Sequence, residues 1–410
     1  MKLLHVFLSI TIWYSYGLAI DVVDSALDGT LNEIELTDDD HGYTVEKLIT
    51  DNGYPVETHN VTTSDGYILT LHRIPHGLNS KSTGRVAYLQ HGILASSSDW
   101  CILGAGKGLA FLLAEEGYDV WMGNARGNSW SRSHVNLTTD DTEFWNFSWH
   151  EIGTIDLPTM IDYILDQTGV PSLYYAGHSQ GTTVFYVLTS TYPEYNNKIA
   201  VQTSLAPIAY MNHMTSPLLK IISYWTDTIE ALASMLGINE FLPNTDFIKF
   251  IIGDDLCKED TVTMSLCTNC IFAICGFSRA EMNETLLPLL TKYSPAGAST
   301  KQVIHYGQEV KSGYFRQYDY GILENMKYYG QMTPPSYDLS QITAPTYLIY
   351  SKNDWLSAQT DVEKLCSHMS NGCAGKIILT DFQFNHLDYT YGIDAPALVY
   401  NKVISLFARH

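Results

Sequence analysis

The chain has 410 residues, of which 45% are hydrophobic and 16% are charged. This balance supplies enough apolar side chains for a large core and excludes an intrinsically disordered protein. The formal net charge of −21 argues against nucleic acid and anionic membrane surfaces as partners. The length is consistent with two or three domains, or with one α/β domain that carries an insertion.

The first 42 residues have the features of segments that precede a folded core. Residues 1–19 combine one lysine, an apolar run and the small residues Gly17 and Ala19, which is typical of a secretory signal peptide. The apolar run is short for a membrane anchor and no later stretch qualifies, so no transmembrane anchor is expected. Residues 20–42 carry many Asp and Glu but no Lys or Arg, which predicts an acidic, solvated leader.

Glycosylation signals and cysteines are consistent with secretion. Asn-x-Ser/Thr sequences predict glycosylation sites in exposed loops at Asn60, Asn136, Asn146 and Asn283. Seven cysteines would meet a compartment that permits disulfides. Their odd number leaves at least one cysteine unpaired or bonded to another chain.

After Tyr43 the chain predicts a hairpin and then alternating strands and helices. Residues 57–62 and 67–74 read as two strands joined by an Asp-Gly turn. We expect further strands at residues 85–90, 118–122, 173–176 and 199–205, and helices at residues 109–116 and 155–167. This alternation predicts an α/β fold with a mostly parallel sheet covered on both faces. Catalytic loops would follow the carboxyl ends of its strands.

The alternation stops after Pro207 and resumes only with a strand at residues 346–350. We therefore expect a core of residues 43–208 and 333–410, interrupted by a helical cap at residues 209–332. An apolar stripe within residues 221–252 either packs as core, or lines an acyl-chain tunnel and touches lipid.

A Gly-x-Ser-x-Gly sequence around Ser179 lies between the strand that ends near Ala176 and a helix through Val184 and Leu188. This arrangement predicts a nucleophile elbow, a tight turn in which glycine replaces side chains that would strike the backbone. The N-terminus of the following helix would stabilise an oxyanion at the serine. The alternative is a glycine-rich surface turn with an ordinary serine.

Two strand ends later in the chain supply a possible acid and base for this serine. The strand at residues 346–350 runs into Asp354, and a strand at residues 376–379 precedes His386. The order Ser179, Asp354, His386 is that of the α/β-hydrolases. Four rivals fit less well because of their positions, namely His368, Asp361, Asp381 and Asp388.

Other polar residues have less certain roles. The strand at residues 85–90 delivers His91-Gly92-Ile93 to a loop, and by position the N–H of Ile93 is a candidate oxyanion donor. A plain strand-to-loop turn is the alternative. Arg126 follows the next strand, and structural hydrogen bonding is favoured over substrate binding.

The cysteines favour disulfides over a metal site. Four of them cluster at Cys257, Cys267, Cys270 and Cys275, without a second Cys-x-x-Cys or an interleaved histidine. In a secreted chain this favours a disulfide over zinc, so no metal is expected. Cys366 and Cys373 bracket a short loop and could form another disulfide, whereas Cys101 stands alone.

Several separate motifs resemble those of the acid lipases, the gastric and lysosomal type with insect digestive relatives. They lie at residues 87–96, 117–128, 177–183, 294–297 and 385–388. The resemblance implies an α/β-hydrolase core with a cap and lid, in a secreted or lysosomal protein. It also implies hydrolysis of triacylglycerols or sterol esters without a cofactor, at a lipid–water interface.

Carried over by motif, the resemblance implies Ser179 as nucleophile, Asp354 as acid and His386 as base. The oxyanion donors would be the N–H groups of Gln180 and Ile93. In the gastric type, the cysteines that match Cys257 and Cys267 are disulfide-bonded. Cys270 departs from the family pattern, so the pairing in this chain stays open.

Two other functions are weighed against a lipase. An esterase for soluble short-chain esters would use the same chemistry. A catalytically silent lipid carrier on the same scaffold is disfavoured, because the nucleophile, acid and base are all present.

Overall fold

A computed structural model describes residues 43–242, 274–369, 371–380 and 383–410. The predicted signal peptide and acidic leader, and the residues Cys257, Cys267, Cys270 and Asp381, lie outside these ranges. No helix in the described ranges is both long enough and apolar enough to cross a membrane.

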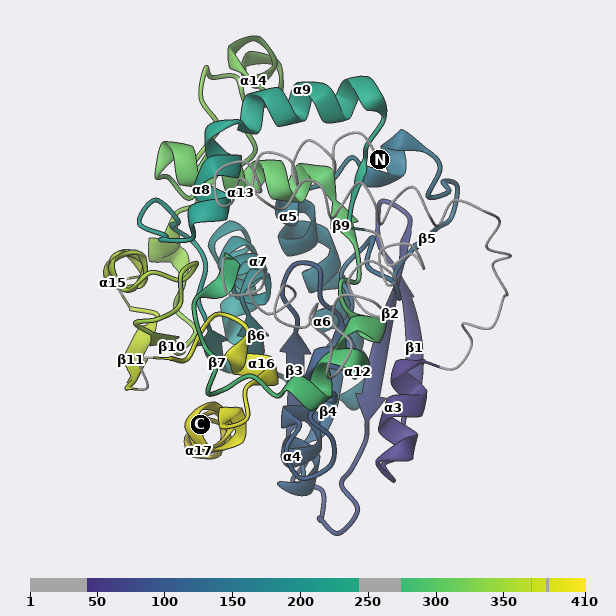
Figure 1. Cartoon of the computed structure of the whole chain (residues 1–410). Coiled ribbons are helices and arrows are strands. Elements are labelled where there is room, and N and C mark those ends of the chain that lie inside the picture. Colours follow the sequence, from purple (N-terminus) through teal and green to yellow (C-terminus); the bar gives the residue numbers. More distant parts are fainter. Residues whose placement is uncertain (1–42, 243–273, 370, 381–382) are drawn as a thin grey trace, which may run out of the picture. The chain divides into compact units, whose positions relative to one another are not determined.

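The central sheet has the order β1-β2-β4-β3-β6-β7-β10-β11, and β5 pairs with β2 (Figure 1). Its strands are β1 (Glu57–Thr62), β2 (Tyr67–Ile74), β3 (Val86–Gln90), β4 (Asp119–Gly123), β5 (Ser133–His134), β6 (Leu173–His178), β7 (Ile199–Leu205), β10 (Thr346–Ser351) and β11 (Cys373–Leu379). All neighbours from β4 to β11 are parallel, whereas β1, β4 and β5 pair with β2 in antiparallel fashion. The mostly parallel α/β sheet predicted from the sequence is confirmed.

Helices cover both faces of this sheet because successive strand residues point to opposite sides. On β3, Tyr88 packs in one apolar cluster and Ala87 and Leu89 in another. The first cluster includes side chains of α6 (Leu157–Thr168), α7 (Gln180–Thr191) and α15 (Gln359–His368). The second includes side chains of α3 (Val45–Asp51), α4 (Leu109–Glu115) and α17 (Asn401–Arg409). The sheet is therefore buried on both sides.

The helix predicted at residues 155–167 begins differently from the expectation. Ser148 and Glu151 form a capping box that starts α5 (Trp149–Glu151). A π-helical turn, η3 (Ile152–Asp156), then leads into α6. Within that turn, a Cβ on Gly153 would lie 2.7 Å from Cβ of Val187, so glycine allows η3 to pack directly on α7.

Residues 209–332 are mainly helical in their described part, as expected. The helices are α8 (Pro217–Tyr224), α9 (Thr226–Leu236), α12 (Leu287–Tyr293), α13 (Thr300–Ser312) and α14 (Ile322–Tyr329). The segment also holds an antiparallel pair, β8 (Glu240–Phe241) and β9 (Ala298–Ser299), which the sequence reading did not include. Strands of two residues are too short to display alternation. The exact division into core and cap stays a prediction.

One predicted disulfide is present, between Cys366 and Cys373, and it links the C-terminal part of α15 to the start of β11. Cys101 and Cys275 are free and buried. Of the predicted glycosylation sites, Asn136 and Asn146 are exposed. The other two differ from exposed loops: Asn60 is exposed but lies in β1, and Asn283 is only partly exposed.

Candidate active site

Ser179 lies in the single-residue turn between β6 and α7. Its φ of 51° and ψ of −116° are unusual for a residue with a side chain, and such strain concentrates at functional sites. The two glycines that flank this turn are required for steric reasons. A Cβ on Gly181 would lie 2.1 Å from the carbonyl oxygen of Gln90, and one on Gly177 would lie 2.6 Å from that of Gly181. The turn is therefore a nucleophile elbow that glycine alone permits.

Three predicted site residues are joined by a chain of hydrogen bonds. The distance from Ser179 Oγ to His386 Nε2 is 2.8 Å. His386 Nδ1 lies 2.9 Å and 3.0 Å from the two carboxylate oxygens of Asp354. Because a carboxylate only accepts, Nδ1 carries the proton and Nε2 is free to accept the serine hydroxyl proton. The structure brings together the nucleophile, base and acid expected from the sequence.

The Asp354 side chain is fixed by the loop that follows it. Its Oδ1 accepts hydrogen bonds of 2.9 Å from the N–H groups of Leu356 and Ser357. Ser179, His386 and Asp354 are 8%, 5% and 3% exposed. Their hydrogen bonds therefore act where little water competes with them.

The two expected oxyanion donors come from separate elements near the serine. Gln180 is the first residue of α7, so its N–H has no acceptor within the helix. A Cβ on Gly92 would lie 3.2 Å from Cβ of Ser179, which places the backbone before Ile93 against the nucleophile. The assignment of Gln180 and Ile93 as donors stays a prediction.

Two buried histidines connect this site to its surroundings, and the sequence reading missed one of them. His178 Nε2 donates to the carbonyl oxygen of His386 at 2.9 Å. His91 Nδ1 donates to the Gly92 carbonyl at 2.7 Å, and its Nε2 accepts from Ala125 N–H. Burial lowers the pKa of His178 to about 3 and that of His91 to about 4, so both stay neutral. The signal for His178 was a polar residue at the end of a buried strand.

Arg126 makes ion pairs that hold parts of the fold together. Its guanidinium bonds Asp156 Oδ1 at 2.7 Å and Asp65 Oδ2 at 2.6 Å, and the side chain is almost fully buried. Asp156 is the last residue of η3, directly before α6, and Asp65 lies in the β1–β2 turn. The structural role favoured for Arg126 therefore agrees with its contacts.

The rival acids and bases have other partners. Asp361 bonds His213 at 2.6 Å, and His368 lies on the exposed part of α15. Asp388 accepts from the N–H of Asn385 at 2.5 Å, which stabilises the loop that carries His386. Burial raises the pKa of Asp388 to about 7.

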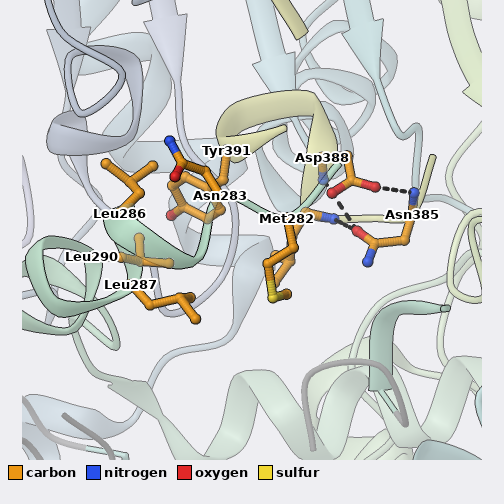
Figure 2. Close-up of a pocket in the computed structure, with 9 residues that line it drawn as sticks. Met282, Asn283, Leu286, Leu287, Leu290, Asn385, Asp388 and Tyr391 are labelled. Carbon is orange, nitrogen blue, oxygen red and sulfur yellow. Dashed lines mark hydrogen bonds between the residues drawn. The ribbon is translucent and has the colours of Figure 1, made fainter. Parts of the chain in front are cut away.

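A small pocket opens beside this loop (Figure 2). Its walls are mostly apolar and come from the region of α12 and from residues 385–391, which flank and follow His386. The lining residues are Met282, Asn283, Leu286, Leu287, Leu290, Asn385, Leu387, Asp388 and Tyr391. The partly exposed sequon residue Asn283 is thus a wall of the pocket. In the residues that the structure describes, no group of three or more His, Cys, Asp or Glu could hold a metal ion.

Known proteins resemble this chain over most of its length. The model of a partial α/β-hydrolase lipase region matches residues 45–104, and that of the α/β hydrolase fold matches residues 88–244. Lipase 3 of Drosophila melanogaster is 44% identical over 87% of this chain and 90% of its own. The gastric triacylglycerol lipase of Rattus norvegicus is 41% identical over 89% of this chain and 91% of its own.

The similarity extends to the lysosomal branch. The lysosomal acid lipase/cholesteryl ester hydrolase of Homo sapiens is 38% identical over 93% of this chain and 95% of its own. Identity of 38–44% over 87–93% of this chain confirms the resemblance found in the separate motifs. The protein belongs to the gastric and lysosomal acid lipase family of α/β-hydrolases.

Proposed function

We propose that this protein hydrolyses carboxylic ester bonds of neutral lipids, with Ser179 as nucleophile, His386 as general base and Asp354 as the orienting acid. The observation that carries the proposal is the unbroken hydrogen-bond chain from Ser179 Oγ through the imidazole to the carboxylate. A strained elbow holds the serine at its end. This arrangement can activate a hydroxyl for acyl transfer.

The reaction follows from the positions of these groups. Ser179 Oγ attacks the ester carbonyl carbon while His386 Nε2 takes its proton. The tetrahedral oxyanion is stabilised by the N–H groups of Gln180 and Ile93, each worth about 3–4 kcal/mol of barrier. His386 then protonates the leaving alcohol. A water, activated by the same imidazole, releases the fatty acid and restores the serine.

Family membership and surface support a lipid substrate. The relatives include a triacylglycerol lipase and a cholesteryl ester hydrolase, so triacylglycerols and sterol esters are the substrate classes we propose. In residues 209–332 several large apolar side chains are exposed, among them Tyr224, Trp225, Met235 and Leu323. Exposed apolar side chains on such a segment suit contact with a lipid–water interface. We propose a secreted or lysosomal protein, in keeping with its Cys366–Cys373 disulfide.

An ester panel tests the substrate class. Purified protein is assayed on emulsified long-chain triacylglycerol, on a long-chain sterol ester and on a soluble short-chain nitrophenyl ester, each from pH 4 to pH 8. We expect hydrolysis of at least one long-chain emulsion. Activity confined to the soluble ester would replace the lipase with an esterase, and no activity on any ester would leave the lipid carrier.

A further inference from the structure

The segment Cys275-Gly276-Phe277-Ser278 passes between the loop that carries Asp354 and the loop that carries His386. The Cys275 carbonyl oxygen accepts two hydrogen bonds of 3.3 Å, one from Trp355 N–H and one from His386 N–H. One oxygen thus joins the residue after the acid to the base itself. We name residues 275–278 the strap.

The next two carbonyls of the strap repeat this pattern. The Gly276 carbonyl accepts from Asn385 Nδ2 at 3.0 Å, and the Phe277 carbonyl accepts from Asn353 Nδ2 at 2.6 Å. Asn353 and Asn385 each immediately precede a predicted catalytic residue. Three consecutive carbonyls are therefore bonded to the immediate neighbours of Asp354 and His386.

Gly276 lies where the strap and the acid loop are closest. Its φ of 112° is a conformation that residues with a side chain rarely adopt. A Cβ at this position would lie 2.3 Å from the carbonyl oxygen of Asn353 and 3.3 Å from Cβ of Asn385. A side chain here would push the two loops apart.

The loop that carries His386 also has hydrogen bonds within itself. Asn385 Oδ1 accepts from Leu387 N–H and Asp388 N–H, and Asp388 in turn accepts from Asn385 N–H (Figure 2). Asn385 therefore bonds its own loop through its carbonyl oxygen and the strap through its amide nitrogen. The loop is stiff in itself, but its place relative to Asp354 depends on contacts from outside.

We propose that the strap is a positioning element for the Asp354–His386 pair. Gly276 is the positioning residue within it: it is required for the distance between the loops that carry Asp354 and His386, and it does not contact substrate. The proposal rests on the proposed function of that pair. Displacement of a catalytic group by about 1 Å can lower the rate about 100-fold. The strap would then influence turnover through the distance between acid and base.

The test compares Gly276→Ala with Gly321→Ala. Gly321 also has a positive φ, of 82°, but a Cβ there meets no atom within 4 Å. Active sites are titrated with a fluorophosphonate, and kcat per titrated site and KM are measured on a soluble nitrophenyl ester. We expect Gly276→Ala to lower kcat per site about 10-fold to 100-fold with KM nearly unchanged, and Gly321→Ala to leave both near wild type.

A purely structural role would lower the number of titrated sites and leave kcat per site unchanged, which would overturn the proposal. If Gly276→Ala does not fold, Asn353→Ala decides, because it removes only the bond to the Phe277 carbonyl. We expect it to lower kcat per site about threefold to tenfold, and an unchanged value would overturn the proposal. Inactive wild-type protein would instead contradict the proposed function.

Discussion

At the scale of single residues, the chemistry proposed for Ser179 depends on what orients its proposed base. The imidazole of His386 is bonded on one side to the serine hydroxyl and on the other to Asp354. Asp354 in turn is held by two backbone N–H groups. The carboxylate thereby fixes both the tautomer and the direction of the ring.

Asp354→Asn should remove the orienting role of the carboxylate while leaving the fold intact. The amide keeps an oxygen for the backbone N–H groups but its NH2 cannot accept from His386 Nδ1, so the wrong tautomer is favoured. We expect kcat on a soluble ester to fall about 10⁴-fold. Thermal melting of the variant, measured in parallel, should remain close to wild type. A kcat within tenfold of wild type would refute the role of Asp354.

The sequence predicted these three residues because each follows a strand and their order is constrained. It did not predict that His178 bonds the carbonyl of His386, or that the Cys275 carbonyl joins the loops that carry Asp354 and His386. Backbone carbonyls are the same in every residue. The hydrogen-bond partners of these carbonyls are set by tertiary packing, so no residue pattern could predict them.

At the scale of elements, the elbow brings the ends of two strands, β3 and β6, against the start of one helix, α7. Gly181, in the first turn of α7, lies against the end of β3, and Gly177 lies against Gly181. The close approach places the N-terminus of α7 beside the loop that follows β3. Packing of backbone on backbone therefore sets the geometry of the proposed site.

Gly181→Ala should cost much more stability than an alanine at another glycine. The new Cβ would lie 2.1 Å from a backbone oxygen that cannot move without β3. We expect the free energy of unfolding to fall by more than about 3 kcal/mol, or the protein to be insoluble. Gly169→Ala is the control, since its φ is 70° but no atom lies within 4 Å. Equal losses in urea denaturation would show that contact with β3 does not matter.

Strands and helices with strong periodicity were predicted well. The hairpin β1–β2 matches residue for residue, and the elbow strand and helix lie where expected. The helical segment before the elbow starts earlier than the predicted residue 155, because the Ser148–Glu151 capping box begins it at Trp149. The pair β8–β9 has two residues per strand, which is below the length at which a pattern can be recognised.

At the scale of the whole molecule, some carboxyl side chains are buried in the interior. Asp99 and Asp388 are buried, and burial raises the pKa of each to about 7. Burial also raises the pKa of Glu309 well above its usual value. Neither carboxyl oxygen of Glu309 has a hydrogen-bond partner among the described residues. The folded protein therefore favours the protonated form of these groups.

The consequence is that the contribution of these carboxyls to stability declines as pH rises. Below about pH 4, these carboxyls are protonated in both folded and unfolded chains. Between about pH 4 and pH 7 the unfolded chain releases its protons while the folded chain retains them, so the unfolded state is favoured progressively. We expect these carboxyls to contribute more to the free energy of unfolding at pH 4.5 than at pH 7.5. The buried, neutral His91 and His178 contribute in the opposite direction, because the unfolded chain protonates them below about pH 6.5.

Asp99→Asn should reduce this pH dependence, because the amide resembles the protonated carboxyl at every pH. We expect the unfolding free energy at pH 4.5 minus that at pH 7.5 to be lower than in the wild type by roughly 2–4 kcal/mol. Asp140→Asn, on an exposed aspartate, is the control and should leave the difference unchanged. Identical pH profiles for Asp99→Asn and wild type would contradict the assignment.

The central claim is that Ser179 is the nucleophile that attacks lipid esters. The most direct measurement treats wild type and Ser179→Ala with a fluorophosphonate probe and assays the same samples on emulsified long-chain triacylglycerol and sterol ester. We expect one labelled residue in wild type, Ser179, and no labelling of the variant. We also expect lipid hydrolysis to fall about 10⁵–10⁶-fold in the variant. Undiminished labelling or hydrolysis in Ser179→Ala would contradict the role of Ser179 as nucleophile.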